Sequence, residues 1–139
     1  MPREPLINRM EESPFKGKTG VQRVLNAFVY SVHGLASAFR HEEAFRQEVL
    51  AAAVLIPIAL LLDVGAPGKA LMVGSVLLVL IVELLNSGIE AAIDRISLDQ
   101  HQLAKRAKDL GSAAVFISLV NVAAVWALVL WDRFLADRL

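Results

Sequence analysis

Three long apolar stretches, separated by short charged segments, dominate the chain. Residues 49–62 and 110–131 carry no charged side chain, and residues 70–93 are apolar apart from a few polar positions. A membrane-spanning helix needs about 20 predominantly apolar residues, so we extend the first stretch back to Phe45. Pro57 in that stretch is compatible with a membrane helix, because neighbouring helices compensate for the lost hydrogen bond. The pattern predicts spans at about residues 45–62, 70–93 and 110–131.

A different periodicity precedes the first span. Between residues 20 and 41, apolar side chains recur at steps of three and four, with polar side chains between them. This spacing predicts an amphipathic helix at about residues 20–41, which beside membrane spans should lie in the membrane interface. Residues 1–19 mix Pro, Gly and charges without periodicity, and we expect a flexible tail. The predicted fold is an all-α membrane protein with a single domain at residues 20–139.

Composition and charge refine this prediction. The chain has 139 residues, of which 56% are hydrophobic, and 14 basic side chains balance 14 acidic ones. The charges gather in the first 48 residues, in residues 94–109 and in the last eight, as in a membrane protein. We expect no nucleic-acid partner. The absence of cysteine excludes disulfides and thiolate metal sites.

The basic residues predict the orientation in the membrane. With three spans, Lys69, Arg133 and Arg138 lie on one side, and the other eleven of the 14 Lys and Arg residues lie on the opposite side. Because cytoplasmic loops carry the excess of Lys and Arg, the N-terminus and residues 94–109 should be cytoplasmic.

The second span contains a polar stripe. After Glu83, polar side chains follow three, seven and eleven positions later, at Asn86, Glu90 and Asp94. On a helix, this spacing places all of them within about 60° of Glu83 around the axis. One interpretation is that they bond to neighbouring helices as packing contacts. However, a charge at depth costs roughly 3 kcal/mol, and a hydrogen bond between membrane helices returns only about 1 kcal/mol. The stripe therefore favours a functional site that runs from the bilayer to the cytoplasm.

Two further segments add chemistry near the cytoplasmic ends of the spans. Lys108 precedes the third span, where a lysine near a helix N-terminus could hold an anion. Residues 41–48 supply three acids, which alone would suggest a solvated face. Together with the stripe, these groups match phosphoryl transfer from a nucleotide to a lipid hydroxyl, because Mg²⁺ binds one or two carboxylates plus phosphate oxygens.

The stretches "EEAFRQE", "LDV", "IVELLNSGIEAAIDRI" and "RAKDLGSAAV" resemble, in order and spacing, motifs of the prokaryotic diacylglycerol kinases. The match covers roughly residues 23–131. The resemblance implies a homotrimer with active sites shared between subunits in the bacterial cytoplasmic (inner) membrane. It also implies Mg²⁺-dependent transfer of phosphate from ATP to diacylglycerol, giving phosphatidic acid.

The resemblance also implies roles for individual residues. Glu83 corresponds to the general base, and Glu42 and Glu90 to the carboxylates that hold Mg²⁺ with ATP, which replaces the solvated-face interpretation for Glu42. The nucleotide contacts would be Arg23, Tyr30, Glu42, Glu90, Asp99, Gln100, His101, Lys108 and Asp109. The lipid contacts would be Arg23, Ser31, Phe45, Arg46, Gln47, Glu48, Leu62, Asp63, Val64, Lys69, Glu83, Ser112, Trp126 and Trp131, with Asn86 and Asp94 as a supporting polar stripe. Asp99 and Gln100 stand where the family often has Glu and Tyr, and Asn121 where it is usually apolar.

Two alternative functions remain. An undecaprenol kinase shares this fold and these core motifs, although "FRQE" favours diacylglycerol. A proton-conducting membrane subunit would use the intramembrane acids without nucleotide. It would leave Lys108 and Asp109 without a role.

Overall fold

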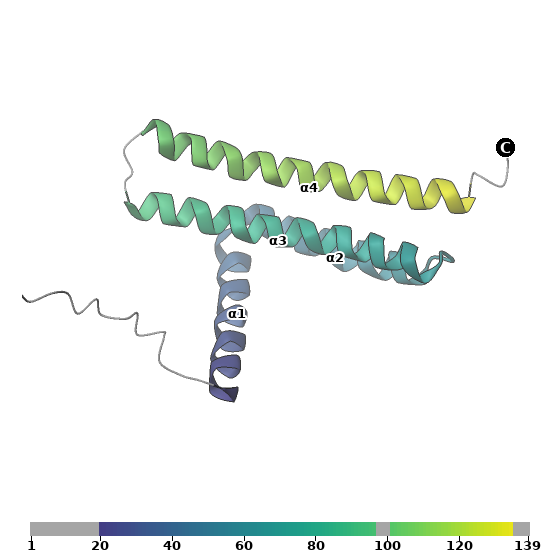
Figure 1. The fold of residues 1–139 in the computed structure, drawn as a ribbon, viewed down its shortest axis with the longest axis horizontal. Coiled ribbons are helices and arrows are strands. Elements are labelled where there is room, and N and C mark those ends of the chain that lie inside the picture. Colours follow the sequence, from purple (N-terminus) through teal and green to yellow (C-terminus); the bar gives the residue numbers. More distant parts are fainter. Residues whose placement is uncertain (1–19, 97–100, 135–139) are drawn as a thin grey trace, which may run out of the picture. The chain divides into compact units, whose positions relative to one another are not determined.

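A computed structural model describes residues 20–96 and 101–134. The predicted tail at residues 1–19, together with Asp99 and Gln100, lies outside this part of the chain. The described part is all-helical (Figure 1). Its helices are α1 (Val21–His41), α2 (Glu43–Leu61), α3 (Ala66–Ile96) and α4 (Gln102–Phe134).

Helices α2, α3 and α4 are long and apolar enough to cross a membrane. The prediction of an all-α protein with three potential spans is therefore confirmed. However, α3 has 31 residues and α4 has 33, so both helices run well beyond the apolar stretches at 70–93 and 110–131. Apolar content indicates where the bilayer is crossed, whereas the backbone hydrogen-bond ladder determines where a helix ends, and that ladder continues through charged residues.

The chain divides into two compact units, one that ends at Ala36 and one that begins at Ser37. The first unit contains most of α1, a helix of 21 residues. Its apolar stripe remains exposed, from 45% at Phe39 to 76% at Val21. The helix therefore does not use this stripe to build a core.

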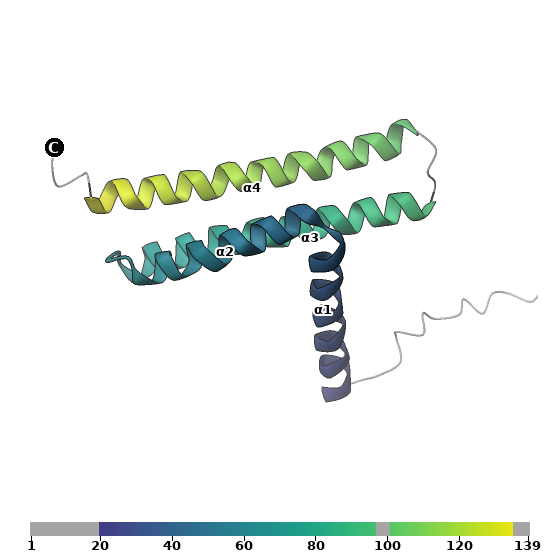
Figure 2. The same cartoon turned by 180° about the vertical axis from the view of Figure 1, so that it is seen from behind.

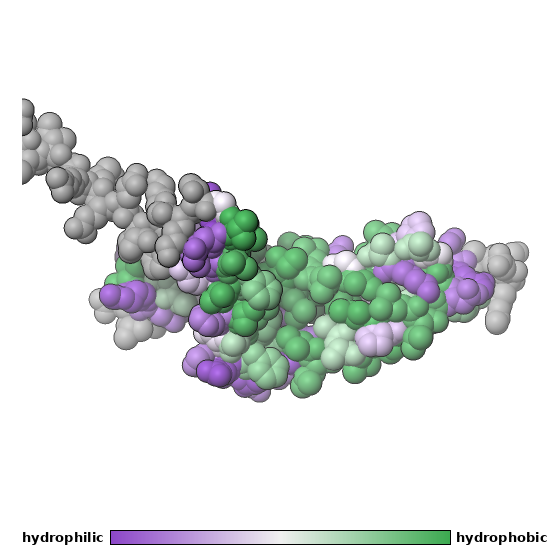
Figure 3. Space-filling view, turned by 90° about the horizontal axis from the view of Figure 1, so that it is seen from below, coloured by the Kyte–Doolittle hydropathy of each residue, from purple (hydrophilic) through white to green (hydrophobic). Residues whose placement is uncertain are grey.

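In the second unit, α3 is the central helix, because it packs against both α2 and α4 (Figures 1 and 2). A buried core lies near the α2–α3 turn and contains Ala59, Val64 and Met72, with Trp126 of α4 packed against it. The Trp126 indole N–H donates to the Met72 carbonyl oxygen at 3.4 Å. Apolar side chains cover much of the helical surface (Figure 3), and the polar ones gather toward the ends of the helices.

Two serines are buried within the apolar helices. The Ser75 hydroxyl donates to the Met72 carbonyl oxygen at 2.8 Å, and the Ser118 hydroxyl donates to the Val115 carbonyl oxygen at 2.7 Å. Each hydroxyl is therefore satisfied within its own helix, which removes the cost of burying an unpaired polar group.

Polar contacts also close the α2–α3 turn. The Lys69 ammonium donates to the Leu60 carbonyl oxygen at 2.7 Å, and the Arg133 Nε donates to the Asp63 carbonyl oxygen at 2.6 Å. Arg133 also forms an ion pair with the Asp63 carboxylate. The α2–α3 turn and the end of α4 lie on the same side of the bundle (Figure 1). Because the last carbonyl groups of a helix have no partner within it, Lys69 completes the end of α2. Arg133 joins the turn to α4 through Asp63.

The Asp63–Arg133 pair predicts a pH dependence of stability. The hydrogen bond from Arg133 and its positive charge lower the pKa of Asp63 below its usual range. A lowered pKa in the folded state adds stability above the unfolded-state pKa of about 3.9, and this stability is lost as the pH falls through the folded-state pKa. We expect Asp63→Asn to lower the melting temperature at pH 6–7, and the difference from wild type to shrink below about pH 4.

Thermal unfolding of the detergent-solubilised protein across this pH range measures the effect. Asp132→Asn is the matched control, because Asp132 forms no ion pair among the residues that the structure describes. A difference for Asp63→Asn that stays constant with pH would contradict the assignment.

Candidate functional site

The polar stripe of α3 runs from a buried position toward an exposed helix end. Glu83 is only 5% exposed, although it carries a carboxyl group. Asn86 and Glu90 are partly buried, and Asp94 is exposed. At about 1.5 Å per residue, Glu90 lies about 10 Å along the axis from Glu83. Because α3 is helical from Ala66 to Ile96, the predicted spacing of the stripe applies throughout.

Further carboxylates surround Glu83. The charges of Glu90 on the same helix and of Glu42 at the start of α2 both act on Glu83. The charge of Glu83 in turn acts on Glu48, which lies on α2. The packing of α2 against α3 therefore brings together acids that lie 41 residues apart in the sequence, as Glu42 and Glu83 do. Because like charges repel, this arrangement suits a bound cation.

Glu48, predicted as a lipid contact, also belongs with these acids, because its charge interacts with that of Glu83. Its Oε2 atom is buried and has no hydrogen-bond partner among the described residues. The resemblance had placed Glu48 among the lipid contacts. A usable signal was present, because Glu48 is the last charged residue before the apolar stretch at 49–62 and therefore stands at the edge of the membrane.

Glu42 occupies the single position between α1 and α2. Its backbone is extended, with φ −105° and ψ 113°, and its side chain forms no capping hydrogen bond to α2. Its carboxylate is therefore not committed to the helix end and remains available to a ligand.

Asn86 connects the stripe to α4. Its amide Nδ2 donates to Glu90 Oε1 at 3.4 Å, and its Oδ1 atom is buried without a hydrogen-bond partner among the described residues. This oxygen lies against Gly111 of α4, so close that a Cβ atom on Gly111 would overlap with it. Gly111 therefore permits the side chain of Asn86 to fit between the two helices.

The start of α4 corrects one prediction. We expected Lys108 near a helix N-terminus with free N–H groups, but α4 begins at Gln102, so Lys108 lies well inside the helix. His101 marks the true start: its Nδ1 accepts the Leu103 N–H at 3.2 Å, and its carbonyl oxygen accepts the Lys105 N–H at 3.0 Å. The helix extends through this charged segment because Leu, Ala, Lys and Arg are good helix formers. The pair of Lys105 with Asp109 at 3.9 Å adds only a few tenths of a kcal/mol.

Lys108 instead joins α4 to α3. Its ammonium group forms an ion pair with Asp94 Oδ1 at 2.7 Å. The polar ends of the two helices are therefore held together beside Glu90. A positive charge at this end of the stripe is suited to phosphate groups that approach from the aqueous side.

The structure separates the predicted lipid contacts into two sets. Phe45, Arg46, Gln47 and Glu48 lie at the start of α2, whereas Leu62, Asp63, Val64 and Lys69 lie around its end and the start of α3. The helical rise places these sets about 25 Å apart, so one lipid headgroup cannot contact both. Of the remainder, Trp126 packs on the core, whereas Ser112 and Trp131 are exposed on α4.

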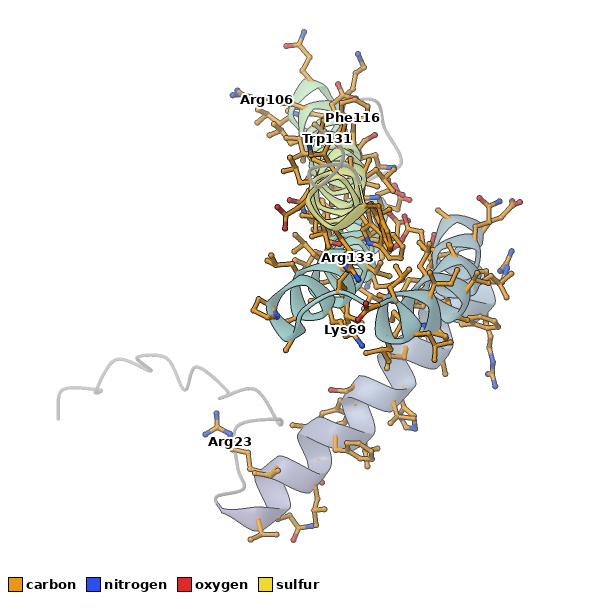
Figure 4. All side chains as sticks on the ribbon, turned by 90° about the vertical axis from the view of Figure 1, so that its right-hand side faces the viewer. Arg23, Lys69, Arg106, Phe116, Trp131 and Arg133 are labelled. Atoms are coloured by element: carbon orange, nitrogen blue, oxygen red, sulfur yellow. The ribbon has the colours of Figure 1, made fainter. Side chains whose placement is uncertain are left out.

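The predicted contacts on α1 belong to the unit that ends at Ala36. Arg23 extends from the first turn of α1 (Figure 4). The Ser31 hydroxyl donates to the Ala27 carbonyl oxygen at 2.9 Å, and Tyr30 is exposed.

A divalent cation fits the donor chemistry of the acidic site. The residues that the structure describes contain no group of three or more His, Cys, Asp or Glu side chains placed to hold a metal alone. The predicted pair supplies one carboxylate from the corner between α1 and α2, Glu42, and one from α3, Glu90. Two carboxylates are few for a metal held by protein alone, but they are what Mg²⁺ uses when a nucleotide supplies the other oxygen ligands.

Three long apolar helices with converging carboxylates define a multi-pass membrane protein with an acidic site at one end of its bundle. The family model "Prokaryotic diacylglycerol kinase" matches residues 29–130. The chain belongs to the prokaryotic diacylglycerol kinase family, which confirms the resemblance seen in the sequence motifs.

Several relatives are similar over nearly their whole lengths. The diacylglycerol kinase of Pseudomonas aeruginosa is 57% identical over 121 residues, which cover 87% of this chain and 98% of that protein. The diacylglycerol kinase of Escherichia coli (strain K12) is 47% identical over 116 residues, which cover 84% of this chain and 95% of that protein. The diacylglycerol kinase of Helicobacter pylori (strain 26695) is 40% identical over 124 residues, which cover 89% of this chain and 92% of that protein.

The contact between Gly111 and Asn86 predicts the effect of a methyl group. We expect Gly111→Ala to destabilise the protein, because overpacking costs about 1–3 kcal/mol, whereas Ala gains only about 1 kcal/mol over Gly in a helix. The displaced Asn86 should also lose its hydrogen bond to Glu90. Thermal unfolding of the purified protein measures the first effect, and phosphotransfer activity measures the second.

Gly74→Ala is the control, because a Cβ atom there meets nothing within 4 Å. We expect it to be neutral or stabilising. Equal tolerance of both substitutions would show that Asn86 does not depend on Gly111.

Proposed function

We propose that this protein phosphorylates diacylglycerol with ATP and so forms phosphatidic acid at the membrane interface. Membership of the family supports a lipid kinase, and each relative named above is a diacylglycerol kinase. The observation that carries the proposal is the group of carboxylates around Glu83. This group lies where an apolar bundle becomes polar, so a lipid and a nucleotide could both reach it.

In this proposal, Glu83 is the general base. It takes the proton from the free glycerol hydroxyl while the hydroxyl oxygen forms a bond to the γ-phosphorus of ATP. The bond between that phosphorus and the bridging oxygen breaks, and ADP leaves with the electron pair. Burial of Glu83 supports this role, because a lipid hydroxyl enters from the apolar side and water is kept away from the phosphoryl group.

Glu42 and Glu90 would hold Mg²⁺ together with the phosphates of ATP. The bound ion would neutralise charge on the transferring phosphate. Asn86 would orient Glu90 through its hydrogen bond, and Asp94 would keep Lys108 near the phosphates. The resemblance supports nucleotide contacts for Arg23, Tyr30, Asp99, Gln100, His101 and Asp109.

We place the diacylglycerol headgroup beside Phe45, Gln47 and Glu48, because this set of predicted contacts includes a carboxylate that interacts with Glu83. Ser31 and Ser112 are further candidates from the resemblance. The set around the α2–α3 turn would contact lipid at the opposite end of the bundle. Asp63 and Lys69 are engaged there by Arg133 and by a backbone carbonyl, which favours a structural role for both.

We also propose a homotrimer with shared sites in the bacterial inner membrane, with the N-terminus in the cytoplasm. Large apolar side chains on α2 and α4 are exposed in the single chain, which supports cover by lipid and by other subunits. The distribution of Lys and Arg supports the orientation. The exposed apolar stripe of α1 supports its placement on the membrane surface.

Transfer of radiolabel from [γ-³²P]ATP to lipid tests the activity. The purified protein, given diacylglycerol or undecaprenol in mixed micelles, should label diacylglycerol at least about 10-fold faster, which corresponds to about 1.4 kcal/mol in transition-state energy. A strong preference for undecaprenol would move the protein to the related polyprenol activity. No label in either lipid would favour the proton-conducting alternative.

If Glu83 is the general base, its substitution should lower kcat but leave the KM for ATP nearly unchanged. Glu83→Gln keeps the shape of the side chain but cannot accept the proton, so kcat should fall at least about 10²-fold with little change in the KM for ATP. Steady-state kinetics at saturating Mg²⁺ measure both constants. Asp132→Asn is the control, because Asp132 is exposed near the end of α4 and outside the acidic group. Turnover at the wild-type rate in Glu83→Gln would exclude Glu83 as the base.

A further inference from the structure

Helix α1 ends at His41 and α2 begins at Glu43, so the chain turns at Glu42 alone. The Glu42 N–H donates to the Ala38 carbonyl oxygen at 2.8 Å, and the Glu42 carbonyl oxygen accepts the Arg46 N–H at 3.2 Å. The backbone of Glu42 therefore belongs to the hydrogen-bond ladders of both helices. The direction of its carboxylate depends on how the end of α1 is held against the start of α2.

Arg46 links the two helices at the corner that Glu42 forms between α1 and α2. Its NH1 group donates to the Phe39 carbonyl oxygen at 3.3 Å and to the Arg40 carbonyl oxygen at 3.2 Å. Both acceptors are in the last turn of α1, where carbonyl groups have no partner within the helix. A cation at a helix C-terminus is also favoured by the helix dipole. These contacts lie within the compact unit that begins at Ser37.

The charge of Arg46 is directed to the carbonyl groups and not to Glu42. Ion pairs in the described part of the chain involve the carboxylates of Asp63, Asp94 and Asp109. The side chain of Glu42 also forms no capping bond. Arg46 therefore fixes the backbone on which Glu42 stands without neutralising its carboxylate.

We propose that Arg46 is a positioning residue for Glu42: by bonding the last carbonyl groups of α1, it aims the Glu42 carboxylate at the acidic site. This inference rests on the proposed function, in which Glu42 holds Mg²⁺ with ATP. It gives Arg46 a role different from the lipid contact that the resemblance implies. Lysine cannot replace Arg46 fully, because it presents a point charge without a planar set of donors.

The two possible roles of Arg46, positioning Glu42 or contacting lipid, predict changes in different kinetic constants. If Arg46 positions Glu42, Arg46→Met should raise the Mg²⁺ concentration for half-maximal activity roughly 10-fold, as loss of an outer-shell partner of a metal ligand does. The KM for diacylglycerol should stay nearly constant. Arg46→Lys should act in the same direction but less strongly, and it carries the test if Arg46→Met does not fold. A raised KM for diacylglycerol with unchanged Mg²⁺ dependence would overturn the proposal in favour of lipid contact.

Arg40→Met is the matched control, because it removes an exposed positive charge from the same turn but leaves the Arg40 carbonyl in place. We expect its Mg²⁺ dependence to match wild type. An equal shift in Arg40→Met would attribute the effect to net charge and overturn the proposal.

Glu42→Gln separates failure of this inference from failure of the proposed function. If Glu42→Gln leaves the Mg²⁺ requirement unchanged, Glu42 is not a ligand, and both proposals fail. If Glu42→Gln raises the requirement but Arg46→Met does not, only the positioning role fails. Because both substitutions would remove the same interaction, the double variant should require no more Mg²⁺ than Glu42→Gln alone.

The mobility of a spin label at the corner between α1 and α2 tests the proposal independently of enzymatic activity. The chain has no cysteine, so Ala44→Cys, at an exposed position in the first turn of α2, accepts a single nitroxide label. We expect the electron paramagnetic resonance spectrum of this label to show greater mobility in Arg46→Met than in wild type or Arg40→Met. Identical spectra in all three proteins would show that Arg46 does not hold the corner.

Discussion

The structure depends on the burial of one acidic side chain, Glu83, inside an apolar helical bundle. A charge at this depth costs roughly 3 kcal/mol. The neighbouring carboxylates of Glu42, before α2, and Glu48, on α2, add repulsion to this cost. On the other side, α4 approaches closely at Gly111, where Asn86 fits between the helices. The central position of α3 follows from this constraint, because only a helix that is covered on two sides can keep such a stripe away from lipid.

The bundle consequently has two different ends. At one end, Met72, Ala59 and Trp126 form an apolar core, and the Asp63–Arg133 pair closes the turn above it. At the other end, polar contacts replace apolar packing, from Glu83 to the Lys108–Asp94 pair. Stability is therefore concentrated away from the acidic site, and the site can hold like charges that a well-packed core would exclude. A cation and a nucleotide supply the missing positive charge and ligands in the reaction that we propose.

Much of this could be predicted from the sequence, because it depends on local patterns. Three stretches of sufficient apolar length predicted three spans, and helical periodicity placed Glu83, Asn86 and Glu90 on one face. The ends of α3 and α4 were not predictable in this way, since many charged residues are good helix formers and a helix can continue through them. For the same reason, the expected helix N-terminus near Lys108 was wrong.

The contacts between helices could not be found from local patterns. Asp63 and Arg133 are 70 residues apart, and nothing in either segment indicates that they meet. The pairing of Asn86 with Gly111 and the contact of Arg46 with α1 depend on how α3, α4 and the corner pack. The division of the predicted lipid contacts into two distant sets likewise appears only when the length of α2 is known. Sequence motifs therefore predicted the acidic residues of the proposed site, whereas the contacts between helices appear only in the structure.

The central claim is that Glu42, at the corner between α1 and α2, and Glu90, on α3, hold one divalent cation with the nucleotide. Electron paramagnetic resonance of Mn²⁺, titrated into the protein with a non-hydrolysable ATP analogue, tests it most directly. Each single variant, Glu42→Gln or Glu90→Gln, should weaken Mn²⁺ binding, and the double variant should lose the protein-bound signal. Binding of Mn²⁺ by the double variant with wild-type affinity would contradict the account.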